Sequence, residues 1–196
     1  MKGVLWYQGE SDDHKPNMYA KLFSAMIDNW RTDWNDDTLP FIFVQLPGNR
    51  YKMDKDFKHW PLIREAQEKV SKTVSNTYMM CALDLGEFND IHPKSKKPVG
   101  ERMENIAMKE IYGKKIDSEK VYSPTLVSFL ACKNKITLYS DKVPEPVSAR
   151  YAWYNYCPVT VFNKEGLPLA PFRTDKNVSS KTEHAEIQQT MVTSSE

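Results

Sequence analysis

Three apolar segments, each followed by a helical pattern of apolar side chains, constrain the fold of this chain more than any other feature. The segments span residues 4–7, 41–46 and 78–85. After them, apolar side chains recur at three- and four-residue spacing over residues 19–30, 60–70 and 99–111. We therefore expect three buried strands and three helices. Prolines near the helix starts and a glycine after the last helix agree with these boundaries: Pro16, Pro61, Pro98 and Gly113.

Alternating strands and helices predict an α/β fold with a parallel sheet, because consecutive βαβ units place their strands in the same direction. In such sheets the loops at the carboxyl ends of the strands line the ligand crevice. Two polar loops occupy that position, residues 8–13 and residues 86–93. They are the candidate site.

The pattern changes after residue 120. Short extended runs at residues 126–130, 135–139, 147–153 and 159–162 predict a small β appendage. The last 21 residues contain few apolar side chains and predict a disordered tail. We therefore divide the chain into an α/β domain over residues 1–120, a β appendage over residues 121–175 and a tail over residues 176–196.

Charge and composition exclude several functions. The 27 Lys and Arg residues nearly balance the 26 Asp and Glu residues, so no net field attracts nucleic acid or an anionic membrane. No apolar run is long enough to span a bilayer, and the N-terminus does not resemble a signal peptide. The histidines and the three cysteines lack metal-ligand spacing, so we expect neither a metal nor another cofactor.

His92 is the candidate general base. It lies in the segment Glu87-Phe88-Asn89-Asp90-Ile91-His92-Pro93. A carboxylate beside an imidazole fixes its tautomer and stabilises the imidazolium that forms on proton transfer, and Asp90 is the nearest carboxylate in sequence. The alternative is a surface histidine in a solvated loop, which these residues alone favour.

The segment Gln8-Gly9-Glu10-Ser11-Asp12 is the second candidate. Gly9 has no side chain, so a ligand can approach its backbone closely. The Gln8 amide can donate a hydrogen bond to a developing oxyanion. The alternative is a polar turn that caps the following helix.

Several blocks together resemble the sialate O-acetylesterase family of SGNH-type carbohydrate esterases, in the same order. The first block is Trp6-Tyr7-Gln8-Gly9-Glu10-Ser11, and the later ones include Ile63-Arg64-Glu65-Ala66-Gln67 and Asp90-Ile91-His92-Pro93. Arg150-Tyr151-Ala152-Trp153 and the segment from Asn163 to Asp175 are similar to the C-terminal signature of the family. The resemblance covers residues 2–175.

This resemblance implies part of a flavodoxin-like, three-layer SGNH hydrolase that removes O-acetyl groups from sialic acids or related sugars by a serine/histidine mechanism. It implies His92 as general base and Asp90 as its orienting acid. In the superfamily the acid usually stands three residues before the histidine, where this chain has Asn89, so Asp84 remains an alternative. Gln8 and Gly9 would lie by the oxyanion or acetyl site, with Glu10 structuring the loop.

The chain departs from the family in two respects. The stretch between Phe129 and Arg150 is shorter than the resemblance implies, which indicates missing strands. The other departure concerns the nucleophile. The family's serine belongs to an earlier Gly-Gln-Ser-Asn block that has no equivalent here, and Ser11 lacks the last glycine of a nucleophile elbow. We therefore expect a C-terminal fragment with little activity alone, whose partners are an acetylated carbohydrate and a complementing N-terminal segment. An export signal would be encoded upstream of Met1, since relatives act in the periplasm, outside the cell or in lysosomes. The alternative is a non-catalytic remnant or sugar-binding module that uses Trp6, Gln8 and the His92 loop.

Overall fold

The computed structural model describes residues 1–49, 59–124, 142–143 and 145–175. The predicted strands at residues 126–130 and 135–139, and the predicted tail, lie outside these residues. The α/β part contains β1 (Val4–Trp6), α1 (Pro16–Asp33), β2 (Phe41–Gln45), α2 (His59–Thr73), β3 (Thr77–Cys81) and α3 (Lys97–Glu110). Three short 3-10 turns (Glu10–Asp12, Leu83–Leu85, Ser118–Lys120) and two C-terminal strands, β4 (Arg150–Tyr151) and β5 (Phe172–Arg173), complete the described elements.

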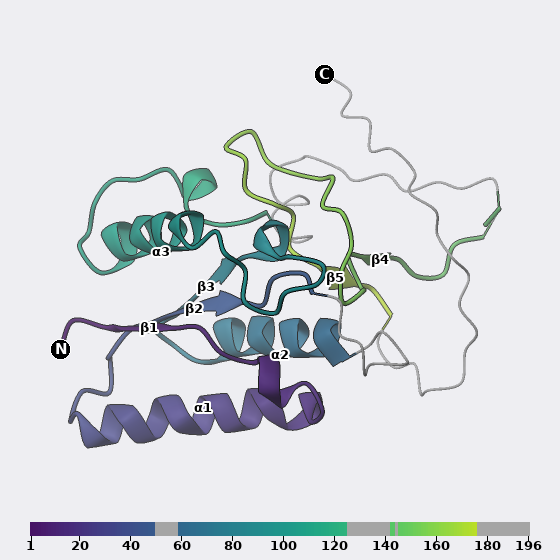
Figure 1. Cartoon of the computed structure of the whole chain (residues 1–196). Helices are drawn as coiled ribbons and strands as arrows, with labels where there is room; N and C mark the ends of the chain where they lie inside the picture. The colour runs from purple at the N-terminus through teal and green to yellow at the C-terminus, as the bar shows by residue number, and fades with distance from the viewer. Residues whose placement is uncertain (50–58, 125–141, 144, 176–196) are drawn as a thin grey trace.

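The first three strands form a parallel sheet in the order β1-β2-β3, with Phe43 opposite both Trp6 and Met79. Helices α1 and α2 cover one face of this sheet and α3 covers the other (Figure 1). The prediction of a three-layer α/β fold is therefore confirmed. The helix boundaries also agree with the sequence pattern, because a single apolar stripe per helix has to face the sheet.

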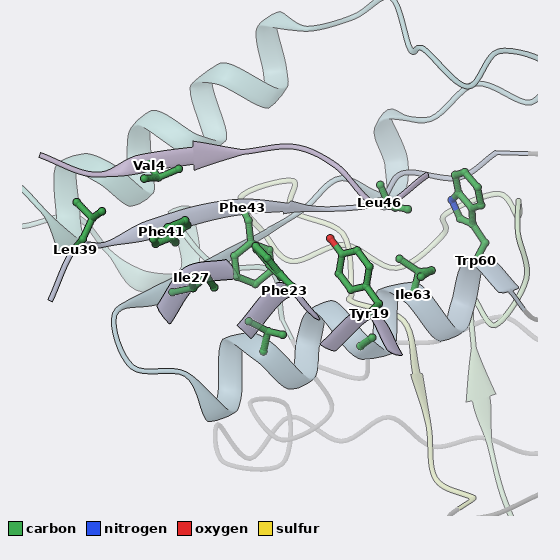
Figure 2. Close-up of a cluster of buried hydrophobic side chains, with 12 residues drawn as sticks. Val4, Tyr19, Phe23, Ile27, Leu39, Phe41, Phe43, Leu46, Trp60 and Ile63 are labelled. Carbon is green, nitrogen blue, oxygen red and sulfur yellow. The ribbon is translucent and has the colours of Figure 1, made fainter. Parts of the chain in front are cut away.

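The core consists of two layers separated by β2, whose five residues are all buried. Phe41 and Phe43 pack on the side of α1 and α2, where Phe23 stands edge-on to Phe43 with ring centroids 5.1 Å apart (Figure 2). Ile42 and Val44 point the other way and pack against α3. Alternation along a strand sends successive side chains to opposite faces, so a strand covered on both sides is apolar throughout.

Strand β1 does not follow the expectation of full burial. Val4 is buried beneath α1, but the side chain of Leu5 is 65% exposed. Among the described residues β1 has one strand neighbour, β2, so it is an edge strand whose other edge carries no ladder. The prediction that this segment is a buried strand is therefore wrong at Leu5, because in the described structure α3 packs on β2 and β3 and not over this side chain.

The fully buried side chain of Arg64 connects the α/β part to the C-terminal segment. Its guanidinium donates to the carbonyl oxygens of Leu46 (2.9 Å) and Pro47 (2.8 Å) after β2, and of Tyr154 (2.9 Å) and Asn155 (3.1 Å). Burial lowers the pKa of Arg64 to about 10, so the group remains cationic at neutral pH. Four carbonyl dipoles compensate a charge that has lost its hydration.

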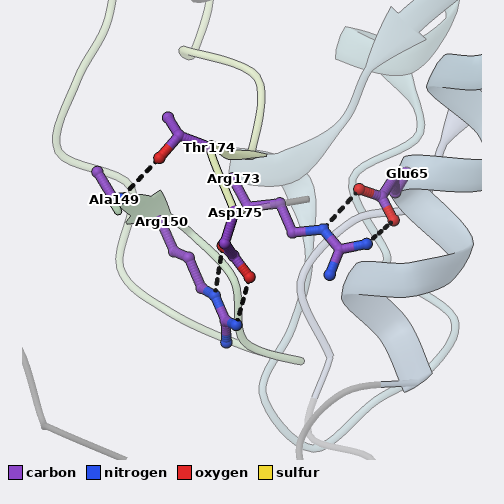
Figure 3. Close-up of polar contacts among 6 residues, drawn as sticks. All are labelled: Glu65, Ala149, Arg150, Arg173, Thr174 and Asp175. Atoms are coloured by element: carbon purple, nitrogen blue, oxygen red, sulfur yellow. Dashed lines mark hydrogen bonds and ion pairs between the residues drawn. The ribbon is translucent and has the colours of Figure 1, made fainter. Parts of the chain in front are cut away.

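Two carboxylate–guanidinium pairs hold the C-terminal strands in place (Figure 3). Arg150 of β4 binds Asp175 (3.0 and 2.7 Å), and Arg173 of β5 binds Glu65 of α2 with two bonds of 2.8 Å. Strands β4 and β5 pair antiparallel. These paired contacts join residues that are far apart in sequence.

The extended runs expected in this region are shorter than predicted. Residues 147–153 contain strand only at Arg150–Tyr151, and residues 159–162 contribute a single bridge between Phe162 and Pro168 instead of a strand. Pro168 has no N–H to donate to a ladder, which limits pairing there. The assignment of residues 121–175 as a separate appendage stays a prediction.

We predict that Arg64→Met lowers the free energy of unfolding by about 3 kcal/mol or more, because several buried carbonyl groups lose their donor. Urea denaturation followed by circular dichroism measures this change. The control is Lys69→Gln on the exposed face of the same helix, expected to change stability by less than about 0.5 kcal/mol. Equal stabilities of the two variants would contradict the role of Arg64.

Candidate functional site

The loops that follow β1, β2 and β3 lie at the same end of the sheet, where the strands have their carboxyl ends, because the three strands are parallel. Tyr7 from the first loop and Ile91 from the third both pack against the core beneath α1 and α2. The ammonium group of Lys96 lies 5.3 Å from the ring centroid of Tyr7. The structure therefore brings the Gln8 loop and the His92 loop to the carboxyl end of the sheet, as the sequence predicts.

The backbone of Gln8 and Gly9 is fixed by α1 and α2. The carbonyl oxygen of Gln8 accepts hydrogen bonds from the Tyr19 hydroxyl (2.9 Å) and from Nε2 of Gln67 (3.2 Å). Gly9 has φ 149°, and a Cβ there would lie 3.2 Å from Gln67 Nε2 and from Leu46 Cδ1. Glycine is needed here both for the backbone conformation and for the space.

The side-chain amide of Gln8 has a defined orientation. It donates to Oδ2 of Asp12 at 2.5 Å. An amide nitrogen carries two hydrogens, so the second N–H can still be donated to another acceptor. This arrangement is compatible with the oxyanion role suggested from sequence, which stays a prediction.

Glu10 is half-buried in the turn after Gly9, and Ser11 is exposed beside it. Burial raises the pKa of Tyr7 to about 12, and the charge of Glu10 adds to this effect. Burial likewise raises the pKa of Tyr19 to about 12. Both phenols are therefore neutral at physiological pH, and Tyr19 retains the proton that it donates to Gln8.

Gln67 is a site residue that the sequence analysis placed in a helical pattern and in a family-like block, without a role in the site. Its Oε1 accepts from the N–H of Leu46 (2.9 Å), and its Nε2 donates to Val44 O and Gln8 O (3.2 Å each). A fully buried amide in the apolar stripe of α2 is the signal that could have identified it. Gln67 fixes the loop after β1 relative to the end of β2.

His92 is exposed, and its backbone N–H donates to Oδ1 of Asp90 at 2.9 Å. The N–H of Lys94 donates to Oε1 of Glu87 (2.8 Å), which closes the loop on itself. Within the described part of the chain, the His92 imidazole makes no hydrogen bond. Asp90 therefore binds the backbone of His92 in this structure, and its pairing with the imidazole stays a prediction.

Asp84, the alternative acid, is already paired. Its two carboxylate oxygens accept bonds of 2.7 Å from the guanidinium of Arg102 on α3, which also donates to the carbonyl of Cys81. This pair fixes the turn after β3 against α3. Asn89, at the position where the superfamily usually has its acid, is exposed.

The loop after β3 rests directly on the loop after β2. A Cβ at Gly86 would lie 1.9 Å from the carbonyl oxygen of Gly48, so only glycine fits. Buried Asn49 donates its side-chain amide to Glu87 O (3.2 Å) and its backbone N–H to Asn155 O (2.9 Å). The C-terminal segment thus helps to position the loop that carries His92.

Other expectations concern Trp6 and metal ligands. The Trp6 ring packs against Phe23 and Trp30 of α1, with centroids 6.0 and 5.8 Å apart, so it forms part of the packing at the core. The described residues contain no group of three His, Cys, Asp or Glu side chains that could hold a metal ion. None of the helices described here is long and apolar enough to cross a bilayer.

We predict that Gly86→Ala destabilises the protein by about 1–3 kcal/mol, because the added methyl group overlaps backbone atoms of Gly48. The matched control is Gly100→Ala in α3, where nothing lies within 4 Å of the new Cβ and a helical alanine is expected to stabilise by about 0.5–1 kcal/mol. Urea unfolding of both variants measures the difference. A change in the free energy of unfolding of the same sign for both substitutions would contradict the close approach of Gly86 to Gly48.

Comparison with known proteins identifies the family of this chain and agrees with its α/β fold. The model of the family "Carbohydrate esterase, sialic acid-specific acetylesterase" matches residues 1–109. Sialate O-acetylesterase of Mus musculus is 30% identical over 158 residues, which is 72% of this chain and 29% of that protein. The Homo sapiens sialate O-acetylesterase is 31% identical over 155 residues, 70% of this chain and 29% of that protein.

A solved structure, a carbohydrate acetylesterase from Xanthomonas citri, superposes with a TM-score of 0.78 at 28% identity and covers 89% of this chain. The chain spans 50% of that structure and less than a third of the curated relatives' length. The family match extends over more than half of the chain and includes the Gln8 and His92 loops. The chain belongs to the carbohydrate esterase family of sialic acid-specific acetylesterases.

Proposed function

We propose that this chain provides the histidine side of a carbohydrate O-acetylesterase active site that acts by a serine/histidine mechanism. The observation that carries the proposal is the meeting of the Gln8–Gly9 loop and the His92 loop at the carboxyl edge of one parallel sheet. Ligands bind at this edge in open α/β sheets. The names of the relatives indicate acetyl esters of sialic acid or related sugars as the substrate class.

In this mechanism, the exposed imidazole of His92 takes the proton of a serine hydroxyl as the serine oxygen bonds to the acetyl carbon. The oxyanion that forms accepts hydrogen bonds from the free N–H of the Gln8 amide and from the backbone at Gly9. The imidazolium then protonates the sugar oxygen as the ester bond breaks, and water hydrolyses the acetyl-serine. Asp90 would rotate from the backbone to the imidazole to stabilise its charge.

The serine comes from a complementing N-terminal segment in this proposal. Two features of β1 support such a partner: its outer edge carries no ladder among the described residues, and Leu5 is exposed there. A depression of about 430 Å³ runs beside this edge, lined by Met1, Leu5, Trp30 and Trp34 among others. A strand added beside β1 would satisfy the free backbone groups, cover Leu5 and end next to Gln8.

A non-catalytic sugar-binding module is the second candidate. It is favoured by one observation: within the described ranges no hydroxyl or thiol group is hydrogen-bonded to the His92 imidazole. General-base chemistry loses its covalent route when the nucleophile is missing. The two candidates differ in turnover once the serine is supplied.

We predict that the chain alone releases acetate from O-acetylated N-acetylneuraminic acid and from 4-nitrophenyl acetate no faster than His92→Ala does. The reason is that, within the described ranges, no serine hydroxyl is hydrogen-bonded to the His92 imidazole that would activate it. Acetate release measured enzymatically, with circular dichroism to show that both proteins are folded, tests this expectation. Turnover that His92→Ala abolishes would mean that a nucleophile, such as Ser11 or an activated water, operates within this chain and that no complementing serine is needed.

We also predict that the chain alone self-associates through β1, and that Leu5→Lys reduces this association without lowering stability, because a lysine on an edge strand disfavours pairing. Sedimentation velocity over a concentration series measures the change. Val147→Lys, at a position 98% exposed and outside β1, is the control. A chain that is monomeric at all concentrations, or an equal effect of the two variants, would contradict an open edge at β1.

A further inference from the structure

A second, smaller pocket lies between the turn after β3 and the C-terminal segment. Its volume is about 160 Å³. Pockets for drug-sized ligands measure roughly 300–1,000 Å³, so this one can take a single sugar ring or ring substituent at most. The residues that line it include Leu83, Asp84, Gly86, Tyr156, Val159 and Phe162.

Aromatic rings are exposed at this pocket. Tyr156 (37% exposed) and Phe162 (43%) line it, and Phe88 (43%) stands edge-on to Tyr156 with ring centroids 5.1 Å apart. Exposed apolar side chains that form a contiguous patch rimmed by polar residues mark ligand-binding grooves, among other interaction sites. The C–H face of a sugar ring is an apolar surface that matches such rings.

The pocket also contains a fixed hydrogen-bond acceptor. Asp84 is held by Arg102 through two bonds of 2.7 Å, and 15% of its side chain is exposed. A carboxylate has about four lone-pair sites, so each oxygen can accept a further bond from a hydroxyl group. The Arg102 pair fixes the direction of these acceptors before any ligand binds.

The position of the pocket connects it to the candidate catalytic histidine. Phe88 precedes His92 by four residues in the same closed loop, which limits the separation of their Cα atoms to about 14 Å. Tyr156 contacts the neighbouring loop, because a Cβ at Gly48 would lie 3.1 Å from its ring. The pocket and His92 therefore lie in neighbouring parts of the same loop region.

We propose that this pocket is a sugar-binding subsite of the esterase, in which Tyr156, Phe162 and Phe88 pack against a sugar ring and Asp84 accepts a hydroxyl hydrogen bond. The inference rests on the proposed function, because it assigns the pocket to the same carbohydrate substrate. Binding of a sugar at this subsite does not require the acetyl group, and this distinguishes it from the esterase reaction. The subsite should bind the sugar whether or not it is acetylated.

The test is an NMR titration of the folded ¹⁵N-labelled chain with N-acetylneuraminic acid and with its O-acetylated form. We expect shifts in residues around Asp84 and Phe162 with both sugars. Phe162→Ala and Phe88→Ala should each weaken binding by about fivefold, as expected for the loss of one aromatic contact. Tyr112→Ala, which removes a comparably exposed ring at the far end of α3, should leave the affinity unchanged.

Equal affinity of wild type, Phe162→Ala and Phe88→Ala would overturn the subsite, as would the absence of binding by either sugar to the folded chain. The esterase proposal has a separate readout, acetate release with and without His92. Binding that depends on Phe162 and Phe88 but not on His92 supports the subsite even where turnover is absent. A loss of affinity in Tyr112→Ala equal to that in Phe162→Ala would also overturn it.

Discussion

The buried guanidinium of Arg64 is the contact on which the rest of this structure depends. It binds carbonyl groups on both sides of the junction between the end of β2 and residues 154–155. A planar group with five donors can satisfy four carbonyls at once, which a lysine ammonium with three donors cannot do. The free-energy cost of burying the charge is thereby offset by its hydrogen bonds to backbone carbonyl groups, and these bonds also join the two segments.

Buried amides extend this arrangement to the candidate site. Gln67 connects the backbone of Gln8 to the end of β2, and Asn49 connects the backbone of Glu87 to residue 155. Gly9 and Gly86 allow the loops to approach closely enough for these bonds. The site is therefore positioned by polar side chains that bind backbone, while the apolar core positions the strands from which the loops leave.

The two outer strands of the sheet, β1 and β3, have different surroundings, and this difference matters for function. At the β3 side, the C-terminal segment supports the His92 loop and forms one wall of the pocket beside Tyr156. At the β1 side, Leu5 and the free edge of the strand are exposed among the described residues. In our proposal, the catalytic base lies on the supported side of the sheet and the serine is supplied along the open side.

The sequence by itself determined the α/β class, the three parallel strands, the approximate helix boundaries and the two loops at the carboxyl ends of the strands, because periodicity is a local property. It extended the third strand to Leu85, whereas β3 ends at Cys81 and a 3-10 turn follows at Leu83–Leu85. Only the tertiary structure decided that Leu5 is exposed, that residues 159–162 form one bridge, that Asp90 binds backbone and that Asp84 pairs with Arg102. It also decided that Phe88 meets Tyr156, 68 positions further along the chain. These features depend on which distant segments come into contact, and residue type and spacing along one chain do not specify those contacts.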